Sequence, residues 1–483
     1  MAGSPTRAEG RGLGPWRNDL AAIVAAAIAA VRPERLVADR LALVAGELLI
    51  DGRSLDPPLT VGRGRLAIVG GGKAAAGMAV GLVDALAAGG IAGGQVTGLV
   101  SVPAGSGRRV TGVEVRETRP AAENLPTSAA VEATREMIAM VSTLGPDELA
   151  VAVVSGGGSA LLAAPPVGVL LEDKVAVTRF LSAAGADITE LNLVRQAASD
   201  VKGGGLARAC MAGRLLVLVL SDVIGDPLEF IASGPCVPVA ATAAAALAVL
   251  ERFGATRAAP RLTAVLQAEA ARAGLGNASA VVSATGSSAP ASWTTPRGCR
   301  VDHVLLGTNA TAVEAAARAA EAIGYTVTIR PVASGTSETA DEVGRRLAAD
   351  GRALAAAVAA DGRARAVIQG GEAVVRLPAD HGRGGRNQQT VAAALSESIT
   401  WGGWPPGLLV ASLGTDGEDG PTAAAGGLAD AAVAGRIQDL GLDAAAAVAR
   451  CDALTLLEAA GGLVVTGPTG TNVADVRIVL ARP

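Results

Sequence analysis

The sequence predicts an α/β protein with two α/β domains, the first of which is built on a doubly wound parallel sheet. Three observations predict this class: short apolar segments alternate with longer helical ones, most apolar segments end in glycine-rich loops, and the alternation restarts after an aperiodic stretch. The 483 residues suffice for two or three domains of roughly 100–200 residues each. Many of the 63 glycines stand in doublets or triplets, which indicates loops that approach a ligand closely.

The composition excludes several classes of site. The chain has 41 lysines and arginines against 45 acidic residues, a net charge of −4, so we expect neither nucleic acid nor an anionic membrane as a partner. Only two histidines are present, and none of the four cysteines forms a Cys-x-x-Cys pair, which argues against zinc sites, redox pairs and histidine-based triads. With 2% aromatic residues, the core must consist of alanine, valine and leucine.

One apolar run, residues 20–31, resembles a targeting segment. It is too short to cross a bilayer, which takes roughly 20 residues. Asp19 adjoins it, and no convincing cleavage site follows. We therefore expect an alanine-rich helix here, no membrane partner and a cytoplasmic protein. The sequence leaves the oligomeric state open, a homodimer included.

The first domain is expected over residues 18–240 and begins with a helix over residues 18–31. Long helical stretches separate its strands, an arrangement typical of parallel pairing with crossover helices. The strands are expected at residues 65–69, 96–102, 148–154 and 214–220.

Residues 241–300 are expected to be a connector, made of an alanine-rich helix up to residue 273 and an aperiodic loop at residues 276–298. The α/β pattern then restarts, and we expect the second domain over residues 301–483. Its strands are expected at residues 301–307, 326–331, 366–369, 373–375, 408–413 and 463–465.

Lys73 comes directly after a glycine triplet, residues 70–72, which follows the first strand. The segment fits the dinucleotide pattern G-x-G-x-x-[GA] only weakly, because no acidic residue follows about 20 positions later, and it is not a Walker A loop. A cation at a helix N-terminus opposes the helix dipole, and an anionic ligand would offset that cost. A surface lysine without a ligand is the alternative.

Two more loops of the first domain carry groups that could donate hydrogen bonds to an anion. Ser155-Gly156-Gly157-Gly158-Ser159 precedes a helix and offers backbone amides and hydroxyls to a phosphate or carboxylate; a tight turn is the alternative. Residues 192–207 place Arg195 and Lys202 seven positions apart, on one helix face, before a second glycine triplet. Here the alternative is a helix end capped by glycine.

Acidic residues follow two strands. Asp222 follows the strand at 214–220, and Asp416 follows the strand at 408–413. Because Mg²⁺ prefers one or two carboxylates together with phosphates, both are candidate ligands; an Asx-turn is the alternative for Asp222. Between them in the chain, Glu372 precedes the loop 382–389, whose Arg383 and Arg386 could clamp an anion.

These segments, together with TGPTGTNV at residues 466–473, occur in one order over roughly residues 18–481 and resemble the glycerate 2-kinase family. The resemblance implies an N-terminal Rossmann-like domain, a C-terminal MOFRL-type α/β domain and an active site in the cleft between them. It also implies ATP-dependent phosphorylation of the 2-hydroxyl of glycerate, assisted by Mg²⁺. Lys73 and Arg386 stand where the family has its proposed catalytic lysine and arginine.

The sequence departs from the family pattern at four places: Thr118-Arg119-Pro120 replaces Gly-His-Pro, Arg195-Gln196-Ala197 replaces Arg-Lys-His, Cys451-Asp452-Ala453 replaces Asn-Asp-Ser, and Ser337-Glu338-Thr339 replaces Gly-Glu-Ala. We infer that nucleotide handling is retained while the acceptor pocket is remodelled. The alternatives are a kinase for another hydroxy acid or polyol and an inactive nucleotide-binding homologue.

The predicted roles divide into four groups. Lys73 and Arg386 are expected to be catalytic, and Asp222 and Asp416 to hold Mg²⁺. The expected substrate-binding residues are Gly72, Arg195, Glu372 and Arg383. The residues expected to bind the ATP phosphates are Ser155, Gly156, Gly157, Gly158, Ser159, Lys202, Gly203, Gly204, Asn309, Gly384, Gly385, Asn387 and Thr415.

Overall fold

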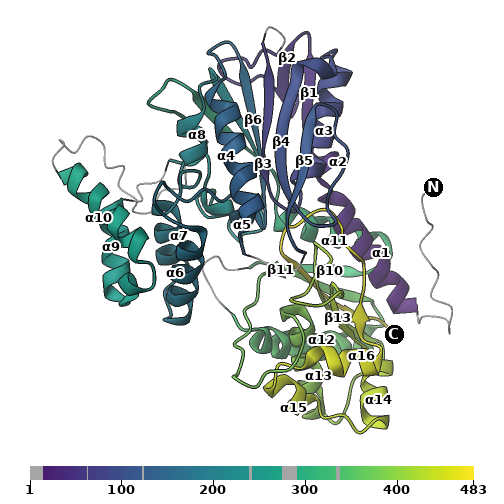
Figure 1. The fold of residues 1–483 in the computed structure, drawn as a ribbon. Coiled ribbons are helices and arrows are strands. Elements are labelled where there is room, and N and C mark those ends of the chain that lie inside the picture. Colours follow the sequence, from purple (N-terminus) through teal and green to yellow (C-terminus); the bar gives the residue numbers. More distant parts are fainter. Residues whose placement is uncertain (1–14, 62–63, 122–124, 239–241, 275–290, 333–337) are drawn as a thin grey trace.

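The computed structural model describes residues 15–61, 64–121, 125–238, 242–274, 291–332 and 338–483. The predicted α/β class is confirmed, with two sheets that occupy opposite ends of the molecule in Figure 1. The loop predicted at 276–298 lies mostly outside the described residues. So does Ser337, one of the four departures from the family pattern.

The first sheet has seven strands in the order β5-β4-β3-β6-β7-β9-β8. All neighbours pair in parallel except β8 and β9, and β6 and β7 are buried along their whole length, as expected for strands covered on both faces. Its strands are β3 (Leu66–Gly71), β4 (Val96–Pro103), β5 (Val113–Arg119), β6 (Leu149–Ser155), β7 (Arg214–Leu220), β8 (Ser292–Thr294) and β9 (Arg300–Gly307).

The helices that cover this sheet pack closely against one another because small residues lie at their contacts. A Cβ on Gly81 of α3 would lie 2.7 Å from the backbone oxygen of Glu34 in α2, so the two helices pack backbone to backbone. A short hairpin, β1 (Leu41–Val44) and β2 (Glu47–Ile50), follows α2. The sheet's helices and turns are α2 (Pro33–Arg40), α3 (Ala75–Ala88), η1 (Gly93–Gln95), α4 (Ser128–Ser142), α5 (Gly158–Leu161), α8 (Gly205–Ala209) and η2 (Ile231–Ser233).

A small helical unit stands beside the first sheet and has its own core. Leu181, Leu250 and Leu262 are fully buried within it. Half of it comes from the predicted connector and half from the predicted first domain. Its elements are α6 (Leu171–Ala183), α7 (Ile188–Ala197), α9 (Ala243–Arg252), η3 (Ala255–Arg257) and α10 (Pro260–Gly274).

The second sheet has six strands in the order β10-β11-β15-β12-β13-β14, and only β10 and β11 are parallel. The last strand of the chain inserts between β11 and β12 and is buried throughout. The strands are β10 (Thr326–Arg330), β11 (Arg365–Gly371), β12 (Leu408–Gly414), β13 (Gly426–Ala429), β14 (Leu463–Val464) and β15 (Asp475–Ala481). The helices are α11 (Asn309–Ala322), α12 (Ala340–Asp361), α13 (Arg386–Ile399), α14 (Ala431–Asp439), α15 (Ala444–Ala449) and α16 (Ala453–Ala460).

Besides the connector, part of which forms the helical unit, four sequence expectations differ from the structure. Residues 292–294 of the expected loop form strand β8, which pairs with β9. The strand expected to open the second domain, β9, pairs with β7 in the first sheet, since its apolar residues complete that parallel sheet. The strand expected at 373–375 is reduced to one bridge between Val374 and Thr339. The first helix, α1 (Pro15–Ala30), packs on α11 of the second domain rather than in the first. We therefore propose a domain boundary between β9 and α11.

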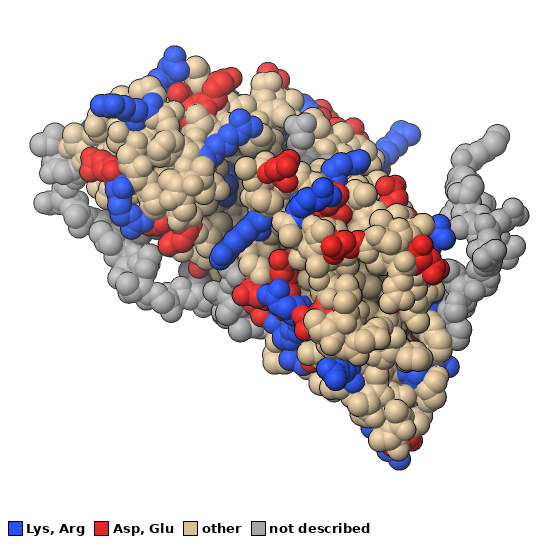
Figure 2. Space-filling model, turned by 90° about the horizontal axis from the view of Figure 1, so that it is seen from below, with Lys and Arg blue, Asp and Glu red and all other residues tan. Residues whose placement is uncertain are grey.

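No helix among the described segments combines the length and the apolar character that crossing a bilayer requires. On the face shown in Figure 2, acidic and basic side chains lie intermixed.

Candidate functional site

A cleft of about 600 Å³ lies where the carboxyl ends of strands from both sheets meet. From the first sheet, Lys73 follows β3 and Asp222 follows β7; from the second, Glu372 follows β11 and Asp416 follows β12. Ligand sites at the carboxyl ends of strands are the rule in α/β proteins. The fold thus brings together four of the residues that the sequence singled out.

Lys73 joins the two domains by charge. Its Nζ donates to Asp416 Oδ2 at 2.8 Å and to Glu418 Oε2 at 2.6 Å. Burial lowers the pKa of Lys73, but the attraction and hydrogen bonds of the two carboxylates outweigh it, so the pKa lies above its ordinary value. Lys73 is therefore a fixed positive charge in the cleft at every physiological pH, not a proton acceptor.

Arg386 is the first residue of α13 and is held by two acids. Its Nε and Nη2 donate to the two carboxylate oxygens of Asp475 at 2.8 and 3.0 Å, and its Nη1 donates to Glu372 Oε1 at 2.8 Å. The bidentate pair fixes the plane of the guanidinium. Burial opposes the charge, yet Asp475 and Glu372 raise the pKa of Arg386, which stays cationic.

The N-terminus of α13 is closed by a buried carboxylate. Asp419 accepts from the backbone amides of Asn387 at 3.0 Å and Gln388 at 2.8 Å. Burial raises the pKa of Asp419 to about 6, although these hydrogen bonds act in the opposite direction. Gly384 and Gly385 line the cleft, whereas Asn387 is buried and bonded inside the domain. Asn387 therefore positions Asp475 rather than facing a nucleotide.

The buried carboxylate of Asp222 forms no direct ion pair with a described cation and is held by a neutral amide. Its Oδ2 accepts one hydrogen bond, from Asn472 Nδ2 at 3.1 Å. Burial and the nearby negative charge of Glu372 raise its pKa to about 7, even though Arg386 and Lys73 act to lower it. An uncompensated buried carboxylate is a natural ligand for a hard cation.

The donor set fits magnesium. Asp222 and Asp416 offer carboxylate oxygens from loops that meet in one cleft. The amide of Asn472 turns its nitrogen toward Asp222, while its oxygen accepts from the backbone N–H of Ala474 at 3.2 Å. Within the described ranges, no three His, Cys, Asp or Glu side chains form a closed metal cage. Mg²⁺ commonly takes one or two carboxylates and completes its shell with water and phosphate oxygens, so such a cage is not required.

Gly156 leaves the space that Asp222 occupies. A Cβ on Gly156 would lie 2.2 Å from Asp222 Oδ2 and 2.5 Å from Asn472 Nδ2. We expect Gly156→Ala to displace the carboxylate, to lower the free energy of unfolding by about 1–3 kcal/mol and to lower kcat/KM about 10-fold or more. Thermal unfolding and steady-state kinetics would measure the two effects. Gly435→Ala is the control, since its Cβ meets nothing within 4 Å, and unchanged kinetics for Gly156→Ala would contradict the assignment.

Two predicted residues of the first domain, Ser155 and Gly72, are buried and make contacts within the protein. The Ser155 hydroxyl is fully buried and accepts the backbone amide of Ala74 at 3.0 Å, which fixes the start of α3. Gly72 is buried against it, because a Cβ there would lie 2.1 Å from the Ser155 hydroxyl. Of the same loops, Gly157 does line the cleft.

The second glycine triplet does not offer its amides to a ligand. The N–H of Gly203 donates to the carbonyl of Ser233 at 3.1 Å, and that of Gly204 donates to the carbonyl of Gly234 at 2.7 Å. Gly158 is buried against Ala232 of the same η2 turn. These glycines are required for close packing, which the sequence pattern cannot distinguish from a phosphate loop.

Asn309 and Thr415, expected to bind nucleotide, clamp the chain that enters β15. Asn309 Nδ2 donates to the carbonyls of Val473 and Asp475 at 2.7 and 2.9 Å. The hydroxyl of Thr415 donates to the carbonyl of Ala474 at 2.8 Å. Both side chains are buried outside the cleft lining and act by positioning Asp475.

Three predicted cations do not join Lys73 and Arg386 in the cleft. Arg195 and Lys202 line a separate pocket together with Ser159. Arg383 is exposed, outside the cleft lining, and its backbone amide donates to Asp452 at 3.0 Å. The structure therefore does not bring Arg195 and Arg383 together with Glu372, and their role in binding substrate stays a prediction.

The sequence analysis missed several residues of the cleft. Glu418 and Asp419 stand in the acidic turn that provided Asp416, but nothing in the turn says which carboxylate faces Lys73. Asp475, which holds Arg386 from behind the cleft lining, was overlooked although it is the only acid of β15 and is completely buried. A lone acid in such a position is the signal that could have found it. Arg119 also lines the cleft.

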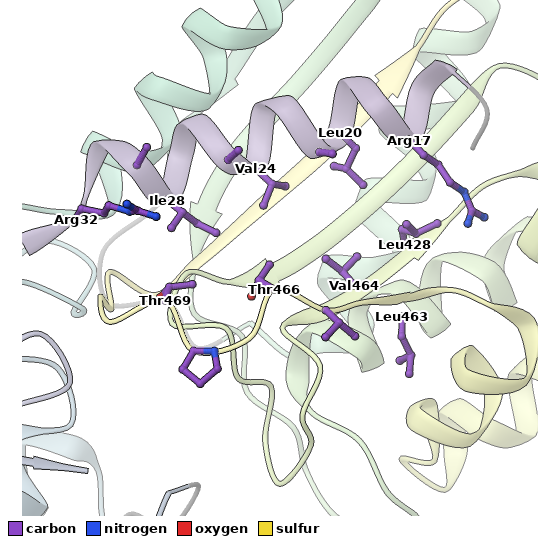
Figure 3. Close-up of a pocket in the computed structure, with 15 residues that line it drawn as sticks. Arg17, Leu20, Val24, Ile28, Arg32, Leu428, Leu463, Val464, Thr466 and Thr469 are labelled. Carbon is purple, nitrogen blue, oxygen red and sulfur yellow. The ribbon is translucent and has the colours of Figure 1, made fainter. Parts of the chain in front are cut away.

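A second cavity, of about 580 Å³, lies between α1 and the segment around β14. Figure 3 shows Val24 and Ile28 of α1 facing the segment that contains Thr466. Arg17 at its edge is already paired with Asp430 at 2.7 Å. No residue predicted to bind substrate, nucleotide or metal lines this cavity.

Comparisons with known proteins point in one direction. Residues 19–267 match the domain of unknown function DUF4147, and residues 365–475 match the MOFRL family. Human glycerate kinase is 33% identical over 97% of this chain and 96% of its own. A protein of Agrobacterium vitis, provisionally named hydroxypyruvate reductase, is 37% identical over 86% of this chain and 87% of its own.

Thermotoga maritima contributes both a sequence and a structure. Its D-glycerate 2-kinase is 34% identical over 75% of this chain and 80% of its own. The crystal structure of a glycerate kinase from the same organism superposes with a TM-score of 0.73 and 30% identity, covering 97% of this chain and all of the other.

Proposed function

Since the chain belongs to the glycerate 2-kinase family and is a phosphotransferase of that type, we propose that it transfers the γ-phosphoryl group of ATP to the 2-hydroxyl of glycerate, with Mg²⁺. The observation that supports this most is the meeting of Lys73 and Arg386, one from each domain, across a cleft that also holds Asp222 and Asp416. Cations and carboxylates from facing domains are what phosphoryl transfer requires.

In the proposed mechanism the protein positions charge. The bond from the γ-phosphorus to its bridging oxygen breaks and ADP leaves with the electron pair of that bond, while a bond from the phosphorus to the acceptor oxygen forms. The proton of the acceptor hydroxyl passes to water. Lys73 stabilises the negative charge on the transferred group, and Arg386, held in plane by Asp475, binds the acceptor carboxylate or the same group. Asp222 and Asp416 would hold Mg²⁺, which neutralises phosphate charge when bound. Both cations keep their protons throughout.

The test is ADP release from ATP and Mg²⁺ with D-glycerate, beside a panel of small hydroxy acids and polyols. We expect release with D-glycerate, and phosphorus NMR of the product should show the ester on the 2-hydroxyl. ADP release with none of the acceptors, from a protein that binds ATP in calorimetry, would contradict the proposal and favour an inactive nucleotide-binding homologue. NADH oxidation with hydroxypyruvate tests the reductase name carried by the Agrobacterium relative.

One observation favours a second candidate function, a kinase that phosphorylates an acceptor other than glycerate. Arg119 and Cys451, two of the residues that depart from the family pattern, both line the cleft. An arginine and a thiol in place of histidine and asparagine change the hydrogen bonds offered to a small substrate. A higher kcat/KM for another hydroxy acid or a polyol than for D-glycerate would establish this alternative.

A further inference from the structure

A small cationic pocket lies beside the cleft. It has a volume of about 90 Å³, and its lining includes Lys174 of α6, Arg195 of α7, Lys202 and Ser159. By the usual share of about 30 Å³ per water, this is the volume of roughly three waters, or one tetrahedral oxyanion. Lys174 and Lys202 are only 7% and 3% exposed.

No acid of the described chain forms a direct ion pair with the cations of this pocket, although the negative charge of Asp200 attracts Lys174. The Nζ of Lys174 is buried and has no hydrogen-bond partner among the residues that the structure describes. Lys202 Nζ donates only to neutral oxygens, the carbonyl of Ser159 at 2.9 Å and the hydroxyl of Ser233 at 3.4 Å. Neither lysine nor Arg195 forms a salt bridge with an acid of the described chain. Buried cations without partners cost stability, so their retention calls for a ligand.

The use of lysine in the whole sequence singles out two of these residues, Lys174 and Lys202. The chain contains only three lysines, Lys73, Lys174 and Lys202. All the other residues among its 41 lysines and arginines are arginines. Lys73 and Lys202 lie on two sides of the glycine loop, since Gly157 approaches the Lys73 stem and Ser159 accepts from Lys202. A compact ammonium with three donors therefore occurs only around this loop.

The lining of the cleft holds more acids than cations. Its cations are Lys73, Arg119 and Arg386, and its acids are Asp222, Glu372, Asp416, Glu418 and Asp419. Lys73 is matched by two carboxylates, Arg386 is matched by two more, and Asp222 adds a further negative charge. A phosphate chain entering the cleft therefore meets an excess of acids, which a divalent cation would offset. The pocket beside the loop offers the complementary charge.

We propose that Lys174, Lys202 and Arg195 form a phosphate-binding subsite that holds one phosphate group of a ligand while the cleft binds the reacting groups. The inference rests on the proposed kinase function for the source of that phosphate, which is the nucleotide or the phosphorylated product. Burial lowers the pKa of Lys174 to about 7 and that of Lys202 well below its ordinary range, and a bound phosphate would restore both charges.

Lys174→Met tests the subsite, because it removes the charge and keeps the length of the stem. Calorimetry would measure Kd for ADP, 2-phosphoglycerate and inorganic tripolyphosphate. We expect Kd for at least one of them to rise about 10- to 100-fold, the range for a lost hydrogen bond to a charged group. The ligand affected identifies the source of the phosphate. Arg179→Met is the matched control, an exposed cation on the same helix.

Stability gives an independent readout. The Tm of Lys174→Met should rise, since an unpartnered buried ammonium is replaced by an apolar group. A lower Tm together with unchanged Kd values for all three ligands would mean that Lys174 is structural and would overturn the proposal. Arg195→Gln, at a half-buried arginine that forms no ion pair, repeats the binding test should the first variant not fold.

Failure of the subsite and failure of the kinase proposal remain distinguishable. Normal kcat with D-glycerate and unchanged Kd values in Lys174→Met would reject the subsite alone. Weakened tripolyphosphate binding in a protein that phosphorylates no acceptor would support the subsite and reject the proposed activity.

Discussion

Lys73→Met is expected to lower kcat about 10³- to 10⁵-fold, the range for removing a cation that stabilises phosphoryl charge. The physical reason lies in its surroundings: the ammonium is the charge that balances Asp416 and Glu418 in the cleft. In Lys73→Met the carboxylates of Asp416 and Glu418 would lose their balancing charge and would repel the phosphate. In the parent protein they orient Lys73, which stabilises the phosphate charge. Single-turnover kinetics with radiolabelled ATP would measure the loss without interference from product release.

The matching control lies at the other end of the same strand. Arg65 precedes β3 as Lys73 follows it, and it forms an exposed ion pair with Glu148 at 2.7 Å. Arg65→Met should leave kcat unchanged and cost no more than about 1 kcal/mol in stability. A Lys73→Met enzyme with kcat within a factor of three of the parent would refute the catalytic assignment. Because the pKa of Lys73 is raised, it should contribute no step to the pH–rate profile near neutrality.

Asp222→Asn is expected to lower kcat/KM about 10³-fold while making the metal-free protein more stable. Activity falls because a neutral amide holds Mg²⁺ less tightly than a carboxylate, so the concentration of Mg²⁺ giving half-maximal rate should rise. Stability increases because ionising a buried carboxylate is costly. Kinetics at graded Mg²⁺ and denaturant unfolding in a chelator would measure the two effects.

The pH dependence of the stability effect follows from the direction of the pKa change. Burial raises the pKa of Asp222 to about 7 from 3.8, so the folded protein binds this proton more tightly than the unfolded chain does. The destabilisation is absent below about pH 4, grows as the pH rises and is complete above about pH 7. At 1.36 kcal/mol for each pH unit the limit is about 4 kcal/mol, and we expect Asp222→Asn to gain about 1–3 kcal/mol at pH 8.

The control for this variant is on the same loop. Asp226 also has a pKa raised by burial, but it does not line the cleft. Asp226→Asn should leave the Mg²⁺ dependence unchanged. Equal stability of the parent and Asp222→Asn at pH 8 would show that the ionised carboxylate does not destabilise the fold. An unaltered Mg²⁺ requirement would show that Asp222 is not a ligand.

Local patterns were sufficient where a residue's role follows from its immediate neighbours. Lys73, Asp222 and Asp416 follow strands, so their places at the carboxyl ends of the strands of their own sheets were predictable. The glycine loops were less informative. A glycine that admits a ligand and a glycine that admits another backbone, such as Gly204, have the same sequence signature, and only the neighbouring carbonyl distinguishes them.

By itself the sequence determined the α/β class, the alternation of elements and the strand ends that carry charge, because these depend on hydrophobic periodicity and turn chemistry within about 20 residues. The tertiary structure alone decided which charges meet. Lys73 contacts acids more than 300 positions away, and Arg386 is oriented by Asp475 at the head of the last strand. The pocket of Lys174 and Lys202 likewise exists only once α6 packs beside the loop at Ser159. Coulomb energy depends on distance and desolvation in space, and chain order encodes neither.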